Sequence, residues 1–257
     1  MKTSVGQTLA VAFGFCNENK KIFLPILASM YLVYSLSVLL NNFFYHDIEN
    51  ILSTEYLTLG EKSTLIENIP SFLPPQYSEI FIALIKGNIL APVSSFIMGL
   101  IYIIGIAILL FLVQSMYTGQ KIKFKYLLKS LPKIIFYSVL SIILIVIGLM
   151  VYVLPGLILI YVLFYVVSES TSNKNSFLNI IKSGVYLVIK HPDYTLGLLS
   201  VITATIFSLN YILIYLNDLG IFGGRGVILD ILFIFIRGIV YTWAVTSNMV
   251  SYLMLES

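Results

Sequence analysis

Six runs of apolar residues divide the chain, and polar or lysine-bearing segments separate them. The runs cover residues 22–40, 89–117, 134–154, 156–167, 194–216 and 227–253. A helix rises about 1.5 Å per residue, so about 20 residues cross a hydrocarbon core of about 30 Å. The pattern therefore predicts an all-α, polytopic membrane helical bundle with about six transmembrane helices.

The fourth run is the shortest, with 12 residues at 156–167. Pro155 and Gly156 stand at its start, and this pair ends the third helix and favours a tight reversal. The fourth run is either a short crossing extended by residues 168–170 or a re-entrant half helix.

The lysines indicate how the helices are oriented, because cytoplasmic connections retain lysine and arginine during insertion. With the amino terminus inside, the cytoplasmic segments hold 11 basic groups and four acids, and the outer loops reverse this balance. A true fourth crossing leaves Lys174, Lys182 and Lys190 inside, whereas a half helix places them outside. We therefore expect a multi-pass protein of the cytoplasmic (inner) membrane with both termini inside.

A threefold organisation repeats along the single membrane domain of residues 1–257. The units are 1–117, with an outer loop at 41–88, then 118–170 and 171–257. Each unit begins with an amphipathic segment expected in the inner interface and continues with a helical hairpin. The repeat is one of physical pattern, not of sequence identity.

The amphipathic segments differ in clarity, and 175–190 is the clearest. One arc of its helical wheel carries Asn175, Asn179, Lys182, Ser183, Tyr186 and Lys190, and the opposite arc carries Phe177, Ile180, Ile181, Gly184 and Val188. The segment 5–16 is fainter, with Val5, Leu9, Ala12 and Cys16 on one side. The segment 121–131 is a shorter, lysine-rich copy.

Composition agrees with a membrane location. Apolar residues make up 59% of the 257 residues, charged residues make up 11%, and the mean hydropathy is +0.97. A soluble core of this size cannot bury so much apolar surface. The net charge of +3 does not imply a nucleic-acid partner. Cys16 is the only cysteine, so it has no internal disulfide partner.

Four features of the second half of the chain belong together. They are Leu154-Pro155-Gly156-Leu157 at the start of the fourth helix, Ser168-Glu169 at its end, the amphipathic segment 177–190, and Ser251-Tyr252-Leu253 in the last helix. In these features the chain resembles a family of bacterial six-helix membrane proteins that includes the membrane domain fused to some glycerophosphodiester phosphodiesterases. The resemblance implies a six-helix fold and a cytoplasmic membrane, without a catalytic motif.

The last apolar run carries the sharpest signal of a site. Asp230, Arg237, Tyr241 and Asn248 fall within about 40° of one another at about 100° per residue. A charge at membrane depth is costly unless it is paired or faces water, so Arg237 must point into the bundle. This polar stripe is either a binding or permeation site or a packing feature. In the second case Arg237 pairs with a neighbouring helix or with Asp230 two turns away.

Other charged groups allow two interpretations each. The lysines of the second connection can bind anionic headgroups, and ordinary positive-inside bias explains them equally well. These lysines are Lys121, Lys123, Lys125, Lys129 and Lys133. Glu169 would bind a proton near neutral pH if it were desolvated, but its place at a helix end predicts solvation.

The sequence contains no recognised catalytic motif and only a weak candidate for metal binding. The sequence has no H-E-x-x-H, no G-x-S-x-G and no Walker lysine loop. His46, Asp47 and Glu49 are a weak metal candidate, because two histidines leave too few ligands. The six carboxylates of the outer loop fit no calcium loop, although they would attract a cationic peptide. We expect no metal and no cofactor.

These patterns predict a non-enzymatic membrane protein. The first hypothesis is a binding, accessory or protective (immunity-type) component that acts on a lipid or peptide. Its expected partners are the lipid bilayer and a membrane-active peptide, a lipid or an ABC transporter, and no nucleic acid. The alternative is a small transporter or permease that uses the polar stripe of the last helix.

Overall fold

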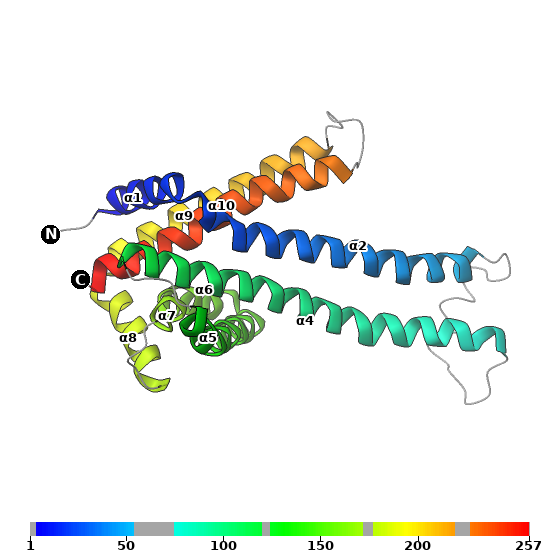
Figure 1. The fold of residues 1–257 in the computed structure, drawn as a ribbon. Coiled ribbons are helices and arrows are strands. Elements are labelled where there is room, and N and C mark those ends of the chain that lie inside the picture. The colour runs from blue at the N-terminus through cyan, green and yellow to red at the C-terminus, as the bar shows by residue number, and fades with distance from the viewer. Residues whose placement is uncertain (1–3, 54–74, 120–123, 172–176, 219–226, 257) are drawn as a thin grey trace. The chain divides into compact units, whose positions relative to one another are not determined.

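The computed structural model describes residues 4–53, 75–119, 124–171, 177–218 and 227–256, and nearly all of these residues are helical (Figure 1). The helices are α1 Val5–Glu18, the 3-10 helix η1 Lys20–Ile22, α2 Phe23–Ser53, α4 Pro75–Tyr117, α5 Phe124–Val151, α6 Val153–Val162, α7 Val166–Glu169, α8 Phe177–Lys190, α9 Pro192–Asp218 and α10 Val227–Glu256. No strand occurs within the described residues. The all-α prediction is confirmed.

Five of these helices contain a segment that is long and apolar enough to cross a membrane. The segments are Lys20–Leu39, Val93–Tyr117, Leu127–Val151, Pro192–Leu216 and Asp230–Glu256. They overlap the five longer apolar runs of the sequence and fit a multi-pass membrane protein. The segment Val153–Glu169 is also apolar but shorter.

The described chain separates into two compact units. Unit 1 consists of Met1–Tyr31 and Tyr102–Ser257, and unit 2 consists of Leu32–Ile101. In unit 2, helix extends into both ends of the expected outer loop, because α2 continues to Ser53 and α4 begins at Pro75. Residues 41–53 contain no glycine or proline, so nothing in the local sequence stops α2 at the membrane surface.

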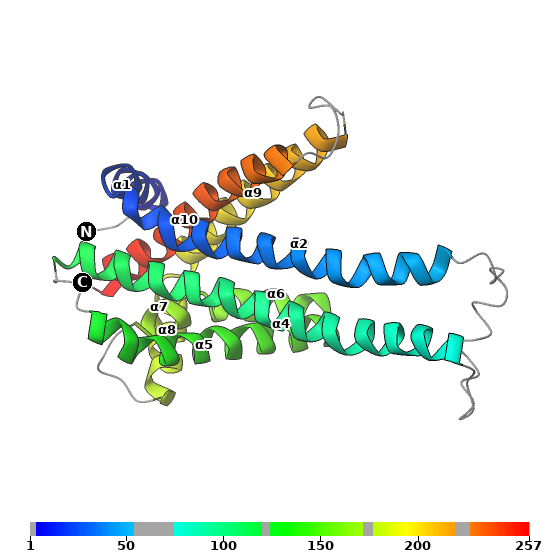
Figure 2. The same ribbon diagram turned by 45° about the vertical axis from the view of Figure 1, so that its right-hand side comes forward.

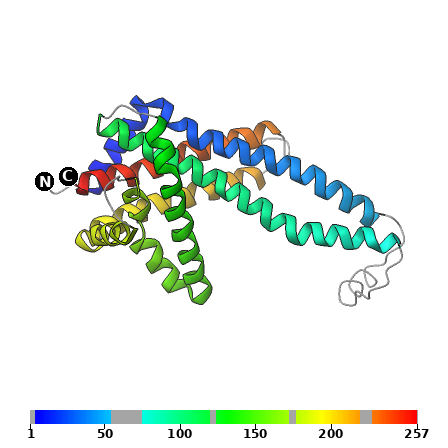
Figure 3. The ribbon, with the colours of Figure 1, turned by 60° about the horizontal axis from the view of Figure 1, so that its bottom comes forward.

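The helices of unit 1 share one end. Figures 1, 2 and 3 place α1, α8 and the C-terminal turn of α10 there. Figure 2 also shows α5 beginning at this end. This end therefore brings together both termini, the lysine-bearing start of α5 and the amphipathic α8.

The reversal between α5 and α6 lies earlier than expected. Helix α5 ends at Val151, and Tyr152 has an extended backbone with φ −169° and ψ 154°. Pro155 lies in the first turn of α6, where its missing N–H costs no helical hydrogen bond. The prediction that Pro155 and Gly156 end the third helix was therefore wrong by three residues, although a tight reversal does occur.

Glycines allow α5 and α6 to approach each other closely. A Cβ added to Gly148 would lie 3.1 Å from the Gly156 Cα, and a Cβ added to Gly156 would lie 2.9 Å from the Leu149 backbone N. Larger residues at either position would force the two helices apart.

The structure confirms some of the predicted amphipathic helices and not others. Helix α1 starts with a capping box between Ser4 and Gln7 and buries Ala12 and Cys16 on the predicted side. Of the copy at 121–131, residues 124–131 form the first turns of α5 and continue through Pro132 without a break, so they are not a separate interfacial helix. The rest of that copy lies outside the described residues.

Helix α8 matches its predicted faces. Ile180, Gly184 and Val188 are buried, whereas Lys182 and Lys190 are exposed. Asn175 and Phe177 belong to the predicted arcs, but their side chains lie outside the described residues. A Cβ added to Gly184 would lie 2.9 Å from the Val166 Cα, which shows how closely α8 approaches α7.

Helix α10 lies at the core of unit 1, in contact with α1, α9 and α7. Met249 and Val250 are fully buried, and Ala244 packs with Leu198 and Ile202 of α9. The candidate site described below therefore forms around α10.

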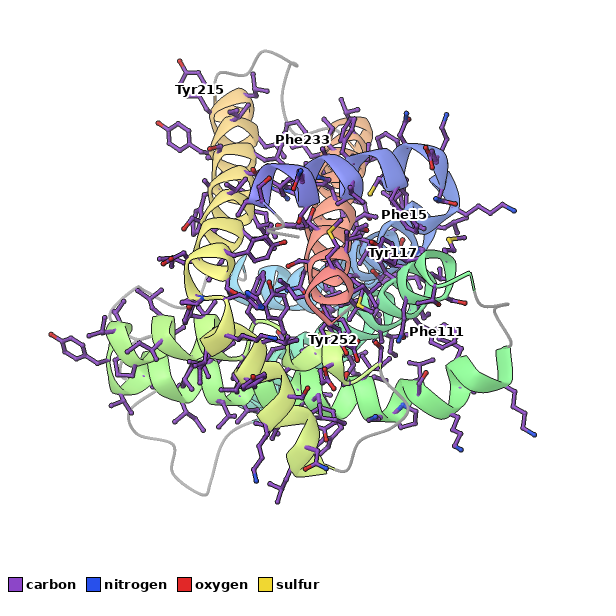
Figure 4. The ribbon with its side chains drawn as sticks, turned by 90° about the vertical axis from the view of Figure 1, so that its left-hand side faces the viewer. Phe15, Phe111, Tyr117, Tyr215, Phe233 and Tyr252 are labelled. Carbon is purple, nitrogen blue, oxygen red and sulfur yellow. The ribbon has the colours of Figure 1, made fainter. Side chains whose placement is uncertain are left out.

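Helices α1 and α4 meet at the same end of unit 1. The Phe15 and Tyr117 rings lie 6.4 Å apart between ring centroids (Figure 4). On α9, by contrast, Tyr215 points away from the bundle in the same view and is exposed. An exposed aromatic side chain on a candidate span is what a lipid-facing surface presents.

Candidate functional site

A cluster of buried polar residues surrounds the four-residue helix α7. Its members on and beside α7 are Tyr165, Ser168, Glu169, Ser170 and Thr171, and all are buried. The Glu169 side chain is 2% exposed, so the prediction that it is solvated was wrong. Helix α7 does not end in water because α5, α8 and α10 all contact it.

Hydrogen bonds within α7 satisfy its own backbone. The Glu169 N–H donates to the Tyr165 carbonyl at 2.8 Å, and the Ser170 N–H donates to the Val166 carbonyl at 3.1 Å. The Thr171 hydroxyl turns back to donate to the Ser168 carbonyl at 2.7 Å. These bonds close the short helix and leave the Glu169 and Ser168 side chains for contacts with other helices.

Helix α10 supplies the partners of α7. The Asn248 amide donates to the Phe164 carbonyl at 3.0 Å, and its oxygen accepts a hydrogen bond from the Ser168 hydroxyl. The Tyr165 and Ser251 hydroxyls are hydrogen-bonded at 2.6 Å. Both ends of the Asn248 amide are therefore occupied, as in a side chain that fixes two helices together.

Charge in the cluster comes from Glu169 on α7 and Lys133 on α5. Lys133 is half-buried and lies within the electrostatic influence of the Glu169 carboxylate. A buried carboxylate is tolerated when a cation and hydrogen-bond donors surround it. The pair therefore links α5 to α7 by charge, beside the neutral links between α7 and α10.

Tyr252 of α10 completes the surroundings of Glu169. Its side chain is fully buried, in the interior of the bundle where α10 meets the α7–α8 segment (Figure 4). The phenol lies beside the Glu169 carboxylate and also interacts with Glu256, without the geometry of a complete hydrogen bond. Three helices thus converge on one carboxylate.

Several other hydroxyls on α10 are buried near this region. Thr242, Thr246 and Ser247 are fully buried, and Thr242 donates to the Gly238 carbonyl at 2.7 Å. The Thr246 hydroxyl lies beside the Cys16 thiol of α1, without the geometry of a complete hydrogen bond. Burial raises the pKa of the Cys16 thiol, and the nearby Thr246 hydroxyl offsets part of this rise.

The four residues of the predicted polar stripe have different neighbours. Tyr241 accepts a hydrogen bond from the Asn210 amide of α9 at 3.4 Å, whereas Asn248 bonds to Ser168 and the Phe164 carbonyl beside α7. The stripe is therefore contacted by different helices along its length.

Arg237 and Asp230 occupy the other half of the stripe. Both are partly exposed, and Arg237 lies within the electrostatic influence of Tyr102 on α4. The Arg237 Nε is buried and has no hydrogen-bond partner among the described residues. This nitrogen is the part of the stripe that neighbouring side chains leave unsatisfied.

The five lysines proposed as a headgroup site do not behave as one group. Lys125 and Lys129 are exposed, as a headgroup role requires. Lys133 instead interacts with Glu169, and Lys121 and Lys123 lie outside the described residues. The only expected headgroup ligands that the structure describes as exposed are Lys125 and Lys129.

Sequence reasoning missed the cluster around Glu169, although a signal was present. The polar run at 168–171 follows an apolar helix directly, and the last helix carries hydroxyls at Thr242, Thr246 and Ser247 and again at Ser251. Repeated hydroxyls in an apolar helix indicate contacts with other helices. In the structure, Ser251 and the neighbouring Asn248 bond to Tyr165 and Ser168, whereas Thr246 lies beside Cys16 of α1.

The chain matches no protein-family model, no curated protein and no solved structure. In the described part of the chain, no three side chains of histidine, cysteine, aspartate or glutamate lie close enough together to hold a metal ion.

Proposed function

We propose that the chain is a non-enzymatic component of a bacterial cytoplasmic membrane, with an accessory or protective role toward a lipid or a peptide. The observation that carries this proposal is the occupation of the last helix by its neighbours. Asn248 forms hydrogen bonds with residues on and beside α7, and Tyr241 forms one with α9. Polar groups engaged in this way hold a bundle together and do not line a continuous path.

The proposal includes a six-crossing topology with both termini inside. Val153–Glu169 would be the fourth crossing, and its roughly 25 Å length as a helix approaches the thickness of a hydrocarbon core. Lys133 of α5 lies within the electrostatic influence of Glu169 in α7. Figure 2 shows α5 beginning on the side of unit 1 where both termini lie. In this topology the lysine-bearing segments face the cytoplasm.

The proposal also retains the three pseudo-repeats and membership of the six-helix family. Two of the residue pairs that carry the resemblance, Ser168-Glu169 and Ser251-Tyr252, lie far apart in the sequence but share the buried cluster. A motif whose parts meet in space has a structural reason to occur together, and this supports the membership.

A challenge with cationic antimicrobial peptides tests the protective role. Cells lacking the chain are expected to be more susceptible, and wild-type protein is expected to restore resistance. A variant with Asn248→Ala, expressed at the same level in the membrane, should restore less because the link between α7 and α10 is lost. Equal susceptibility with and without the chain would contradict a protective role.

A small transporter is the second candidate, and the buried Arg237 Nε favours it. A buried guanidinium N–H without a partner inside a membrane helix is costly unless water or an anionic solute approaches it. Proteoliposomes holding the wild type would then take up an anion, and Arg237→Ala would abolish uptake while Arg237→Lys would retain part of it. Uptake that Arg237→Ala leaves unchanged would exclude the stripe as a transport site.

A further inference from the structure

Helix α8 has three distinct faces, of which only one is used inside the bundle. The buried face packs Ile180 into a cluster with Tyr137, Leu163 and Val166. Leu187 and Val188 are buried on the same side. The helix is therefore anchored firmly to α5, α6 and α7, and its other faces are presented outward in a fixed orientation.

The outward half of α8 divides into an apolar edge and a polar face. Leu178 and Ile189 form the edge, and their side chains are 61% and 69% exposed. At about 100° per residue these two lie about 20° apart around the helix. Two large exposed aliphatic side chains on one edge are unfavourable in water and favourable among acyl chains.

Lys182 stands at the border between this apolar edge and the polar face. On the same wheel it lies about 20° from Ile189 and about 40° from Leu178. Lys190 is about 100° from Ile189, so it points away from the edge, and its ammonium lies 6.0 Å from the Tyr186 ring centroid. The two lysines of α8 thus have different positions relative to the apolar edge.

The charge and the location of α8 both fit an anionic membrane surface. Residues 177–190 contain no acidic side chain, so the lysines have no competing partner within α8. The helix lies at the end of unit 1 that carries both termini and the start of α5 with its exposed Lys125 and Lys129 (Figures 1 and 2). A positive, partly apolar surface at this end is complementary to an anionic membrane surface.

We propose that α8 lies in the membrane surface and that Lys182 binds the phosphate of an anionic phospholipid. Leu178 and Ile189 insert among the acyl chains, which sets the Lys182 ammonium at the depth of the phosphate. Lys190 faces the aqueous side and contributes only to the general positive potential. This inference rests on the proposed membrane location but not on the accessory or protective role.

The test uses the full-length protein in a neutral detergent, with lipid binding followed by native mass spectrometry. The probes are short-chain phosphatidylglycerol and phosphatidylcholine of equal chain length. The wild type is expected to bind phosphatidylglycerol about tenfold more tightly than phosphatidylcholine. No preference between the two lipids would overturn the proposal.

Lys182→Gln and Lys190→Gln form a matched pair, because both remove one charge from an exposed position of the same helix. Lys182→Gln should weaken phosphatidylglycerol binding about fivefold, and Lys190→Gln less than twofold. Equal losses in the two variants would overturn the assignment to Lys182. An unchanged thermal unfolding midpoint confirms that each variant is folded.

A second comparison separates a lipid from a soluble anion as the source of the phosphate. Leu178→Asn combined with Ile189→Asn removes the apolar edge and keeps both lysines, and it should weaken phosphatidylglycerol binding. Inorganic phosphate at millimolar concentration should not displace the lipid. Displacement by phosphate, or binding unaffected by the double variant, would show a simple anion site and overturn the proposal. Loss of lipid binding with peptide protection intact would leave the proposed function standing.

Discussion

At the scale of single residues, Glu169 is the most informative position. A carboxylate that is 2% exposed needs compensation, and Lys133 and Tyr252 lie beside it. Removing one member of a buried pair leaves the other charge uncompensated, which costs more than the pair contributes. The loss of unfolding free energy in a double variant should therefore be smaller than the sum of the losses in the two single variants.

Glu169→Gln is expected to lower the free energy of unfolding in detergent by about 1 to 3 kcal/mol, since Lys133 is only half-buried. Lys133→Gln should cost a similar amount. The double variant should cost less than the sum of the two, with a coupling of about 1 kcal/mol, as a double-mutant cycle of unfolding measurements would reveal. Strict additivity would show that the two charges do not interact.

Cys16 gives a prediction about pH. Because burial raises the pKa of its thiol, the thiolate forms only at a pH above that of an exposed cysteine, whose pKa is about 8.5. Alkylation of the folded protein by iodoacetamide should lag behind that of the denatured protein, and the lag should still be present at a pH of about 9. Equal rates at every pH would contradict the burial of Cys16.

At the scale of elements, local pattern and tertiary contact contribute differently. The two faces of α8 were predictable because a periodicity of about 3.6 residues is a local property. The burial of Glu169 was not predictable, because it depends on contacts with α10. Asn248 of α10, which bonds to Ser168, is 80 residues away from it in the sequence. Pro155 shows an intermediate case, since the reversal was predictable but its position depended on where α6 starts.

Asn248→Ala tests the link between α7 and α10. It leaves the Phe164 carbonyl and the Ser168 hydroxyl without their partner, which should cost about 1 kcal/mol of unfolding free energy. Asn210→Ala is the matched control, because its contact with Tyr241 is longer at 3.4 Å and should cost less. Thermal unfolding in the same detergent compares the two, and a larger loss for Asn210→Ala would contradict the cluster as the main link.

Gly184→Ala tests the close approach of α8 to α7. Its Cβ would meet the Val166 backbone at 2.9 Å, so the helices must separate, with an expected loss of about 1 to 3 kcal/mol. Gly14→Ala in α1 is the control, because a Cβ there meets nothing within 4 Å and alanine favours helix. Stabilisation by Gly184→Ala would show that α8 is not held against α7.

At the scale of the whole molecule, five long apolar helices fit a multi-pass membrane protein, and the short segment Val153–Glu169 decides the proposed topology. If this segment crosses, the exposed lysines of α5 and α8 share one side of the membrane with both termini. If it does not, α8 lies on the opposite side and loses the anionic inner surface that its lysines fit. The side on which α8 lies is therefore the point on which the proposed topology and the lipid site both depend.

Labelling of Lys190→Cys by a membrane-impermeant maleimide in intact cells tests this point most directly. Cys16→Ala first removes the only native cysteine, and Glu61→Cys serves as the control expected outside. We predict that Glu61→Cys is labelled in intact cells, and that Lys190→Cys is labelled only after the membrane is permeabilised. Labelling of Lys190→Cys in intact cells would contradict the six-crossing account.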